Sequence, residues 1–364
     1  MNKKLLALTL VLALVLGVLA GCGGGGTSDE ADPELTVGFI FIGPINDGGY
    51  TQAHYEGAVR MKEHFAGKVD FKYIENIDDG DIQASLTAGQ NLLDQGCDVI
   101  VGASFGFMEA LDTLANSGDY DDKYFLHFSG YLANDTNFDN FFGSIDEARY
   151  LAGIVAGSMT ETNKLGYVGA LPYTEVMIGI NAYTLGAQSV NPDVEVNVVY
   201  IGSWGDPEKE LAAAEQLLAE GCDIITQHSD STGPQLAAQD AGAYAIGYNL
   251  ANPAAPDAYL TAPIWHHDAY YIHAVENILN GTFAPESYYG TLATGYIALA
   301  PMSDLVPADV QELVAEKEAE MISGAFAPFS GYIENADGSV LCKEGQSLTR
   351  AEIWDIQQLI KGAK

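Results

Sequence analysis

Basic residues are scarce in this chain. Its 364 residues include 15 lysines and arginines against 50 aspartates and glutamates, so the formal net charge is −35 at pH 7. A basic stripe is the minimum footprint for binding a phosphate backbone, and a charge of this sign repels polyanions. The composition therefore excludes nucleic acid as a partner, and we interpret the acidic excess as a source of solubility.

Cysteine is scarce as well. The chain has Cys22, Cys97, Cys222 and Cys342, and the last three make an odd number, which is not a disulfide framework. Cys97 and Cys222 each lie between a glycine and an aspartate at the start of an apolar run. We expect both to be small core residues rather than redox centres or metal ligands.

Motifs of catalysis and metal binding are missing where they could work. We expect no functional Gly-x-Ser-x-Gly elbow, P-loop or Gly-x-Gly-x-x-Gly. His266 and His267 lack the i, i+4 spacing of a zinc-binding pair, and residues 78–81 lack the distal glutamate of a calcium loop. We therefore predict a turn and helix cap at residues 78–81, no metal, no cofactor and no enzymatic activity.

The single long apolar run lies at the N-terminus. Two lysines precede about 16 apolar residues (5–20), a length that fits a signal peptide and is below the roughly 20 residues of a membrane-spanning helix. We predict that residues 1–21 are a lipoprotein signal peptide and that Cys22 is lipidated. Residues 22–34 would be a flexible tether at the outer face of the cell membrane or in the periplasm. The alternative is an ordinary secretory signal with an incidental cysteine.

One pattern recurs along the chain at an offset of about 125 residues. Residues 91–100 (NLLDQGCDVI) match residues 216–225 (QLLAEGCDII). Upstream of the two copies, Asp81 and Asp206 each open an amphipathic segment, so we expect two acidic N-caps. Each segment ends at a glycine suited to the left-handed position that follows a helix. The repeated unit is therefore helix, tight turn and strand.

The predicted strands are continuous apolar runs. Residues 37–44 are echoed by residues 165–172, and we expect the helices that follow them to end near Gly67 and Gly186. Uninterrupted apolar strands separated by helices indicate parallel sheets covered on both faces. We predict an α/β fold with two similar lobes and a ligand between the carboxyl ends of their strands.

Polar and aromatic residues follow these strands. Aromatic side chains suit stacking on a flat heterocycle, while amides and carboxylates can read its edge. No lysine or arginine lies in these loops, which disfavours a highly charged ligand. Asn46 and Asp47 are equally suited to capping the next helix. The candidate ligand-binding residues are Asn46, Asp47, Tyr50, Phe105, Trp204, Asp230, Tyr248, Asn249 and Trp265.

Five motifs at these positions resemble the basic membrane protein family of substrate-binding lipoproteins, which includes bacterial purine nucleoside receptors of ABC transporters. The resemblance covers about residues 35–333. It is carried by residues 43–50 (GPINDGGY), 147–157 (EARYLAGIVAG), 179–187 (GINAYTLGA), 227–231 (QHSDS) and 245–249 (AIGYN).

The resemblance implies the type I periplasmic binding protein fold, with two Rossmann-like lobes joined by three crossovers. We expect residues 35–143 plus 265–285 to form the N-terminal lobe, and residues 144–264 plus 286–330 to form the C-terminal lobe. Within residues 331–364, the sequence NADG predicts a hairpin turn, and a helix capped by Thr349 follows it.

The resemblance also implies a ligand site. Family members hold a purine between the lobes, and the loop after the first strand contacts it. That loop corresponds here to Asn46, Asp47 and Tyr50. The aromatic stacking positions of the family are similar to Phe105 and Trp204.

One departure from the family bears on the ligand. In the nucleoside-binding members an aspartate and a lysine contact the ribose, whereas this chain has Asn249 at the first position and no lysine between Tyr248 and His273. We therefore expect a lipid-anchored monomer that binds a free nucleobase such as adenine, or a nucleoside, and delivers it to an ABC permease. The alternatives are an anchored hydrolase that uses His228 and Asp230, and a sensor that presents the ligand to a kinase.

Overall fold

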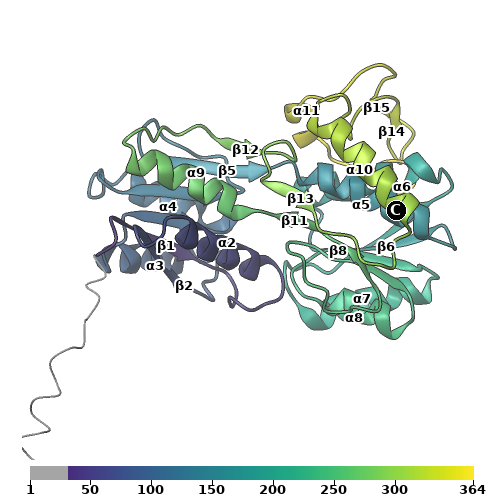
Figure 1. The fold of residues 1–364 in the computed structure, drawn as a ribbon, viewed down its shortest axis with the longest axis horizontal. Helices are drawn as coiled ribbons and strands as arrows, with labels where there is room; N and C mark the ends of the chain where they lie inside the picture. The colour runs from purple at the N-terminus through teal and green to yellow at the C-terminus, as the bar shows by residue number, and fades with distance from the viewer. Residues whose placement is uncertain (1–31) are drawn as a thin grey trace, which may run out of the picture. The chain divides into compact units, whose positions relative to one another are not determined.

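The computed structural model describes residues 32–364 of the chain. The predicted signal peptide and Cys22 lie outside the described residues, as does nearly all of the predicted tether. Leu35–Lys364 form one unit, which is described below and drawn in Figure 1. Within the described part of the chain, no helix combines the length and the apolarity that crossing a membrane requires.

The first lobe is built on a sheet of six parallel strands. From one edge to the other they are β12 (Tyr288–Gly290), β5 (Phe138–Gly143), β4 (Tyr124–Phe128), β3 (Val99–Gly102), β1 (Leu35–Ile40) and β2 (Val69–Ile74). The helical elements of this lobe are α2 (Tyr50–His64), α3 (Ile82–Asp94), the short 3₁₀-helix η1 (Phe105–Phe107), α4 (Met108–Ala115) and α9 (His267–Leu279).

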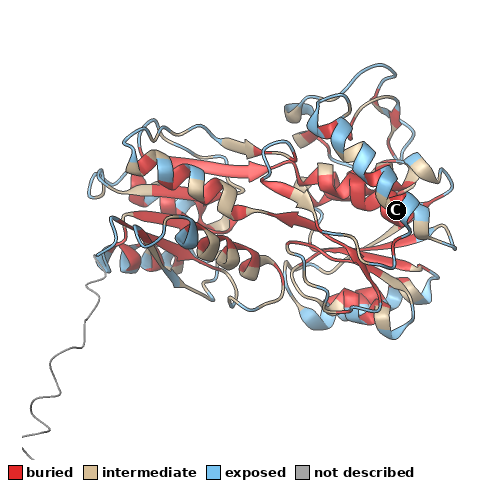
Figure 2. Cartoon of the chain, viewed as in Figure 1, coloured by how far each residue is buried: buried red, intermediate tan, exposed pale blue. Residues whose placement is uncertain are grey.

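Both faces of this sheet are covered. Val37 and Phe39 of β1 belong to the same core as Met61 of α2, whereas Ile40 packs in a second core with Leu92 of α3. Successive side chains of a strand point to opposite faces, so the two cores lie on opposite sides of the sheet. Figure 2 shows the resulting buried strands between more exposed helices. The predicted parallel α/β lobe is confirmed.

The second lobe repeats this topology. Its five parallel strands, from one edge to the other, are β10 (Tyr259–Thr261), β9 (Tyr244–Ile246), β8 (Ile224–His228), β6 (Lys164–Gly169) and β7 (Glu195–Tyr200). This order matches β5, β4, β3, β1 and β2 of the first lobe, so the repeat seen in the sequence is a repeat of the fold. The helices of this lobe are α5 (Ile145–Met159), α6 (Thr174–Val190), α7 (Pro207–Ala219) and α8 (Gly233–Asp240).

The two repeated helices are capped as predicted. The Asp81 carboxylate accepts hydrogen bonds from the backbone N–H groups of Gln83 and Ala84, and that of Asp206 accepts one from Lys209. Both helices then turn into a strand through glycines with positive φ, +86° at residue 96 and +92° at residue 221. Residues without this conformational freedom would be strained there.

Gly186 does not end a helix, contrary to expectation. It lies inside α6, where a methyl group on it would overlap the backbone carbonyl of Tyr150 in α5. Gly153 of α5 lies just as close to the carbonyl of Tyr183 in α6. The glycines therefore allow these two helices to pack backbone to backbone, a role that local sequence does not distinguish from helix termination.

The chain crosses between the lobes three times, as predicted. It crosses between β5 and α5, between β10 and α9, and between β12 and the second lobe. Strands β11 (Pro263–Trp265) and β13 (Ile297–Leu299), which follow β10 and β12 in the chain, pair antiparallel with each other. The expected lobe boundary is wrong for β12, which we assigned to the second lobe with residues 286–330. β12 pairs with β5 of the first sheet, and its three residues were too short a strand signal to place it.

The C-terminal segment packs against the second lobe. α10 (Ala308–Ile322) contacts α5, and the predicted hairpin forms from β14 (Ile333–Glu334) and β15 (Val340–Cys342). α11 (Arg350–Trp354) begins with the predicted cap, because Thr349 and Glu352 form a capping box. The last residues run beside β7, where the N–H of Val196 donates to the carbonyl of Gly362 at 2.8 Å.

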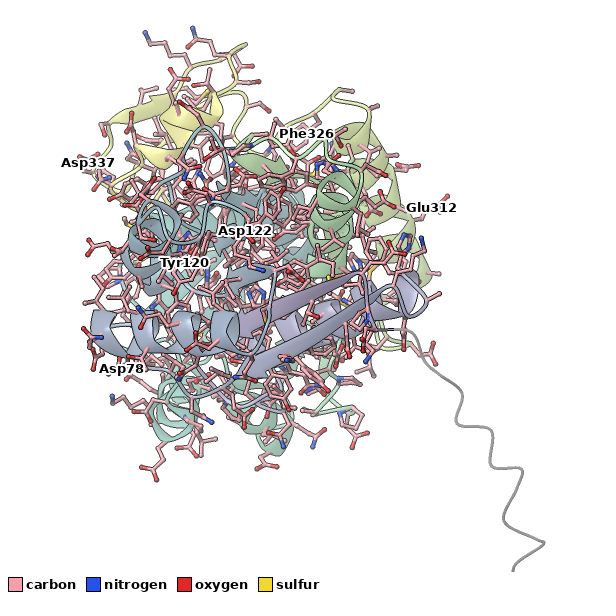
Figure 3. All side chains as sticks on the ribbon, turned by 90° about the vertical axis from the view of Figure 1, so that its left-hand side faces the viewer. Asp78, Tyr120, Asp122, Glu312, Phe326 and Asp337 are labelled. Atoms are coloured by element: carbon pink, nitrogen blue, oxygen red, sulfur yellow. The ribbon has the colours of Figure 1, made fainter. Side chains whose placement is uncertain are left out.

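Acidic side chains populate the surface. Figure 3 labels Asp78, Asp122, Glu312 and Asp337, which come from widely separated parts of the chain, and each of them is exposed. Cys97, Cys222 and Cys342 are buried free thiols, and burial raises the pKa of Cys97 and Cys222 to about 11. These two cysteines are therefore core residues, as predicted.

Candidate functional site

A cavity lies between the two lobes, at the carboxyl ends of both sheets. Open parallel sheets bind ligands at this edge. The lining residues follow β1, β3 and β4 in the first lobe and β6 to β9 in the second. They are Ile42, Tyr50, Ser104, Phe105, Phe128, Ser129, Glu175, Trp204, His228, Asp230 and Tyr248.

Aromatic residues from both lobes line the cavity. Tyr50 is fixed by its hydroxyl group, which donates to the carbonyl of Ala103 at 3.0 Å and leaves the ring as the lining surface. Phe105 is 51% exposed although it is a large apolar residue. Trp204 lies on the second lobe, with its ring centre 6.4 Å from that of His228. These rings offer stacking surfaces for a flat ligand from two sides.

On the second-lobe wall of the cavity, the His228 side chain lies close to two other polar side chains. Its Nε2 lies 3.3 Å from the Tyr248 hydroxyl and 3.6 Å from Oε1 of Glu175. Burial lowers the pKa of His228 to about 4, despite the neighbouring glutamate. The imidazole is therefore neutral near pH 7, and it can both donate and accept a hydrogen bond.

Asp230 lines the same wall from the turn after β8. Burial raises the pKa of this carboxyl group well above its usual range, and the nearby carboxylates of Asp47 and Glu210 raise it further. The neighbouring Asn249 side chain acts in the opposite direction and lowers this pKa. The site therefore contains a carboxyl group that is shielded from water, and a hydrogen-bond donor on the ligand would stabilise its ionised form.

The turn that carries Asp230 is held from behind by buried polar groups. Glu210 accepts hydrogen bonds from the Ser229 hydroxyl at 2.7 Å and from the Ser231 N–H at 3.0 Å. Arg149, which is fully buried, donates to the carbonyl of Gln227 at 2.7 Å. The Arg149 guanidinium also lies 3.9 Å from the centre of the Tyr248 ring, a cation–π geometry. These contacts fix the cavity wall before any ligand arrives.

Two predicted binding residues of the first loop do not line the cavity. Asn46 is exposed, and Asp47 caps α2. The Asp47 carboxylate accepts hydrogen bonds from the N–H groups of Gly49, Thr51 and Gln52 at 2.8–3.0 Å. Of the two roles that the sequence left open for this residue, the structure shows the helix cap.

Asn249 and Trp265 are buried and are not among the lining residues. Asn249 has φ of +72° and lies in the segment that joins β9 to β10. Trp265 is also buried, and its ring packs edge-on against Phe128 at 5.4 Å. Thus Tyr50, Phe105, Trp204, Asp230 and Tyr248 line the cavity, and the other four predicted residues do not.

The sequence analysis missed part of the lining. Phe128 is the last residue of β4, Ser129 follows it and Glu175 follows β6, so the same strand-end rule would have found them. His228 belongs to the motif at residues 227–231, but it was given a role of its own only in the hydrolase alternative. The residues at the end of β4 do not differ in character from those of an ordinary strand end, so local sequence does not mark them as ligand contacts.

Residues 102–106 read Gly-Ala-Ser-Phe-Gly, a Gly-x-Ser-x-Gly placed between a strand and a helix, contrary to the expectation that none is so placed. Ser104 does line the cavity. Its hydroxyl donates to Oδ2 of Asp79 at 2.5 Å, whereas a serine nucleophile needs a histidine partner. The ring of His127 instead has Nε2 3.3 Å from the carbonyl oxygen of Phe105.

The histidines around residue 267 do not point to a common centre. His267 stacks on His54 with ring centres 3.6 Å apart, while His273 pairs with Glu286 at 2.7 Å. Within residues 32–364, no three His, Cys, Asp or Glu side chains are grouped as metal ligands would be.

The two lobes touch beside the cavity. The Asn252 side chain of the second lobe donates to the carbonyl of Gly48 in the first. Gly49 approaches the carbonyl of Asp230 so closely that a methyl group on it would overlap that atom. The lobes therefore meet backbone to backbone at the rim of the cavity.

Comparison with known proteins identifies the family of this chain. Residues 34–328 match the family model Bmp, described as ABC transporter substrate-binding protein PnrA-like. A purine-binding protein of Brucella abortus is 37% identical over 92% of this chain and 93% of its own length. A putative ABC transporter glucose-binding protein of Haloferax volcanii is 32% identical over 85% of this chain and 77% of its own length.

Solved structures agree on the fold. A solute-binding protein of an ABC transporter system from Aeropyrum pernix gives a TM-score of 0.69 at 19% identity, over 83% of this chain and 93% of its own. One from Conexibacter woesei gives 0.66 at 24% identity, over 80% and 98%. With two Rossmann-like lobes around a lined cavity and a family match across most of the folded unit, the chain belongs to the Bmp family of ABC transporter substrate-binding proteins.

Proposed function

We propose that this protein captures a purine base or nucleoside between its lobes and passes it to a membrane permease. The observation that carries the proposal is the pairing of aromatic rings across the cavity, Tyr50 and Phe105 from the first lobe and Trp204 and Tyr248 from the second. Base stacking on an aromatic side chain contributes about 1–3 kcal/mol for each base. The purine-binding relative from Brucella supports the same ligand class.

The lobed architecture supports a closure mechanism. A ligand that contacts residues of both lobes binds the closed form better than the open form, so it shifts the population toward closure. The permease then receives a closed, loaded protein.

Isothermal titration of the full mature chain tests the proposal. The panel should contain adenine, guanine, adenosine, guanosine, glucose and an amino acid mixture. We expect saturable binding of at least one purine and none of glucose. Binding of glucose alone would overturn the proposal and favour the specificity named for the Haloferax relative. Chromatography of the recovered ligand separates a carrier, which returns it unchanged, from the hydrolase alternative.

We also propose that Cys22 carries a lipid anchor and that residues 22–34 tether the folded unit to it. A cysteine preceded by an apolar signal and followed by glycines supports this. The test is fractionation of cells that express the wild-type chain or Cys22→Ser. The wild type should be in the membrane fraction and the variant should be released or retain its signal. Equal membrane association of a correctly processed variant would contradict the anchor.

A further inference from the structure

Two carboxylic acids line the cavity, and no lysine or arginine is among the described residues that line it. Glu175 comes from the first turn of α6, and Asp230 comes from the turn after β8. Both lie on the second lobe. These two carboxyl groups give the wall hydrogen-bond acceptors, which complement a ligand that carries donors.

Glu175 is available to a ligand. Its side chain is 23% exposed, and its Oε1 lies 3.6 Å from Nε2 of His228. An ionised carboxylate has about four acceptor positions on two oxygens, so one contact with His228 leaves acceptor capacity for the cavity. The N-terminal end of α6 also stabilises a negative charge at this position.

Asp230 differs from the carboxylates around it. Asp47 is engaged by backbone N–H groups of its own loop, and Glu210 by Ser229 and Ser231. Neither of these two lines the cavity. Asp230 therefore faces the ligand among acidic neighbours, and a ligand N–H donor would stabilise the ionised form of this carboxyl group, which accepts hydrogen bonds.

Arg149 is a cation of the second lobe that does not line the cavity. It is fully buried, donates to the carbonyl of Gln227 and lies against the ring of Tyr248. A ligand oxygen or anion would thus meet carboxylates at the surface of the cavity, with the guanidinium behind the aromatic ring.

We propose that Glu175 is a specificity-determining residue and that, together with Asp230, it selects amino-substituted purines over oxo-substituted purines of the same size. The exocyclic amino group and ring N–H of adenine are donors, whereas hypoxanthine presents an oxygen at the same ring position. We expect this preference to be a difference in affinity. The oxo group cannot donate a hydrogen bond to the carboxylate, so it leaves that acceptor unpaired or places a second acceptor oxygen against it. This inference rests on the proposed purine-binding function.

The test is a titration of adenine and of hypoxanthine against wild type, Glu175→Gln and the control Glu208→Gln. Glu208 is an exposed glutamate of the same lobe, in the first turn of α7. We expect wild type and control to bind adenine at least tenfold more tightly than hypoxanthine. In Glu175→Gln, adenine affinity should fall about tenfold, while hypoxanthine affinity should hold or rise because a glutamine amide can donate to the oxo group.

The outcomes separate this inference from the function on which it rests. If no purine binds, the proposed function fails. If purines bind but wild type binds hypoxanthine as tightly as adenine, the proposed selectivity is overturned and the proposed purine-binding function stands. The same conclusion follows if Glu175→Gln has the same ratio of adenine to hypoxanthine affinity as wild type. Asp230→Asn, titrated in the same way, should also lower the ratio of adenine affinity to hypoxanthine affinity. Circular dichroism and thermal unfolding of each variant establish that the fold is intact.

Discussion

The Asn252 side-chain amide donates a hydrogen bond of 3.1 Å to the carbonyl oxygen of Gly48, and this bond joins the second lobe to the first. Asn252 lies between β9 and β10, and Gly48 lies just before α2. The two residues therefore form a latch at the rim of the cavity. It can form only when the lobes are in contact.

Loss of the latch should weaken ligand binding modestly. Asn252→Ala removes one hydrogen bond of the closed form, worth about 1 kcal/mol, so we expect an approximately fivefold rise in Kd. Isothermal titration measures the change. Asn280→Ala, at an exposed position in the first lobe, is the control and should leave Kd unchanged. An Asn252 variant with wild-type affinity would show that the latch does not stabilise the loaded state.

A methyl group on Gly49 should keep the lobes apart. Its Cβ would overlap the backbone carbonyl of Asp230, and backbone atoms on both sides can separate only if the lobes do. We expect Gly49→Ala to lower affinity at least tenfold and to enlarge the radius of gyration in small-angle scattering with ligand present. Gly205→Ala, where the nearest atom is 3.5 Å away, should do neither. A Gly49→Ala protein that binds and compacts normally would refute closure at this contact.

Asp230 should reduce the stability of the ligand-free protein. Its pKa is raised in the folded state by burial and by Asp47 and Glu210, so folding near neutral pH requires either proton uptake or a buried charge. Asp230→Asn should therefore raise the free energy of unfolding by about 1–3 kcal/mol at pH 7, while weakening ligand binding.

The pH dependence of that gain follows from the sign of the shift. A raised folded-state pKa means that the native protein binds the extra proton, so wild-type stability at this site recovers as the pH falls through the raised pKa toward the ordinary value of 3.8. Urea unfolding at pH 7 and pH 4.5 should show a smaller gain for Asp230→Asn at the lower pH. An equal gain at both pH values would contradict a raised pKa.

Arg350 should anchor the C-terminal segment at the crossovers. Its guanidinium donates to Asp146 at 2.9 Å and to the Ser144 hydroxyl at 2.5 Å, and it lies over the ring of Tyr289 at 4.9 Å. Only 3% of the Asp146 side chain is exposed, so Arg350→Met would leave a buried charge unpaired. We expect a loss of about 3–5 kcal/mol in urea unfolding.

The matched control for this prediction is Lys361→Met. Lys361 pairs with Glu334 at 2.8 Å, but its side chain is 72% exposed, so its loss should leave the free energy of unfolding nearly unchanged. The double variant Arg350→Met with Asp146→Asn should recover part of the stability. If Arg350→Met and Lys361→Met lower the free energy of unfolding equally, the burial of the Arg350–Asp146 pair does not contribute to stability.

Local patterns were sufficient to predict much of the fold. The helix caps Asp81 and Asp206 and the glycines that follow both helices act within a few residues, so the printed sequence contains their whole explanation. The duplicated topology followed from two copies of one pattern. By contrast, the role of Gly186 depends on a carbonyl of another helix, and the position of β12 depends on its pairing with β5.

The sequence by itself determined the lobed parallel α/β architecture, the strand ends where a ligand would lie and five of the residues that line the cavity. Periodicity, caps and turn residues are local properties, and strand polarity places all the following loops at one edge. Only the tertiary structure decided that Asp47 caps a helix, that Asn249 and Trp265 do not line the cavity, and that Glu175 and His228 do. These roles depend on distances between residues far apart in the chain, and local sequence patterns do not encode those distances.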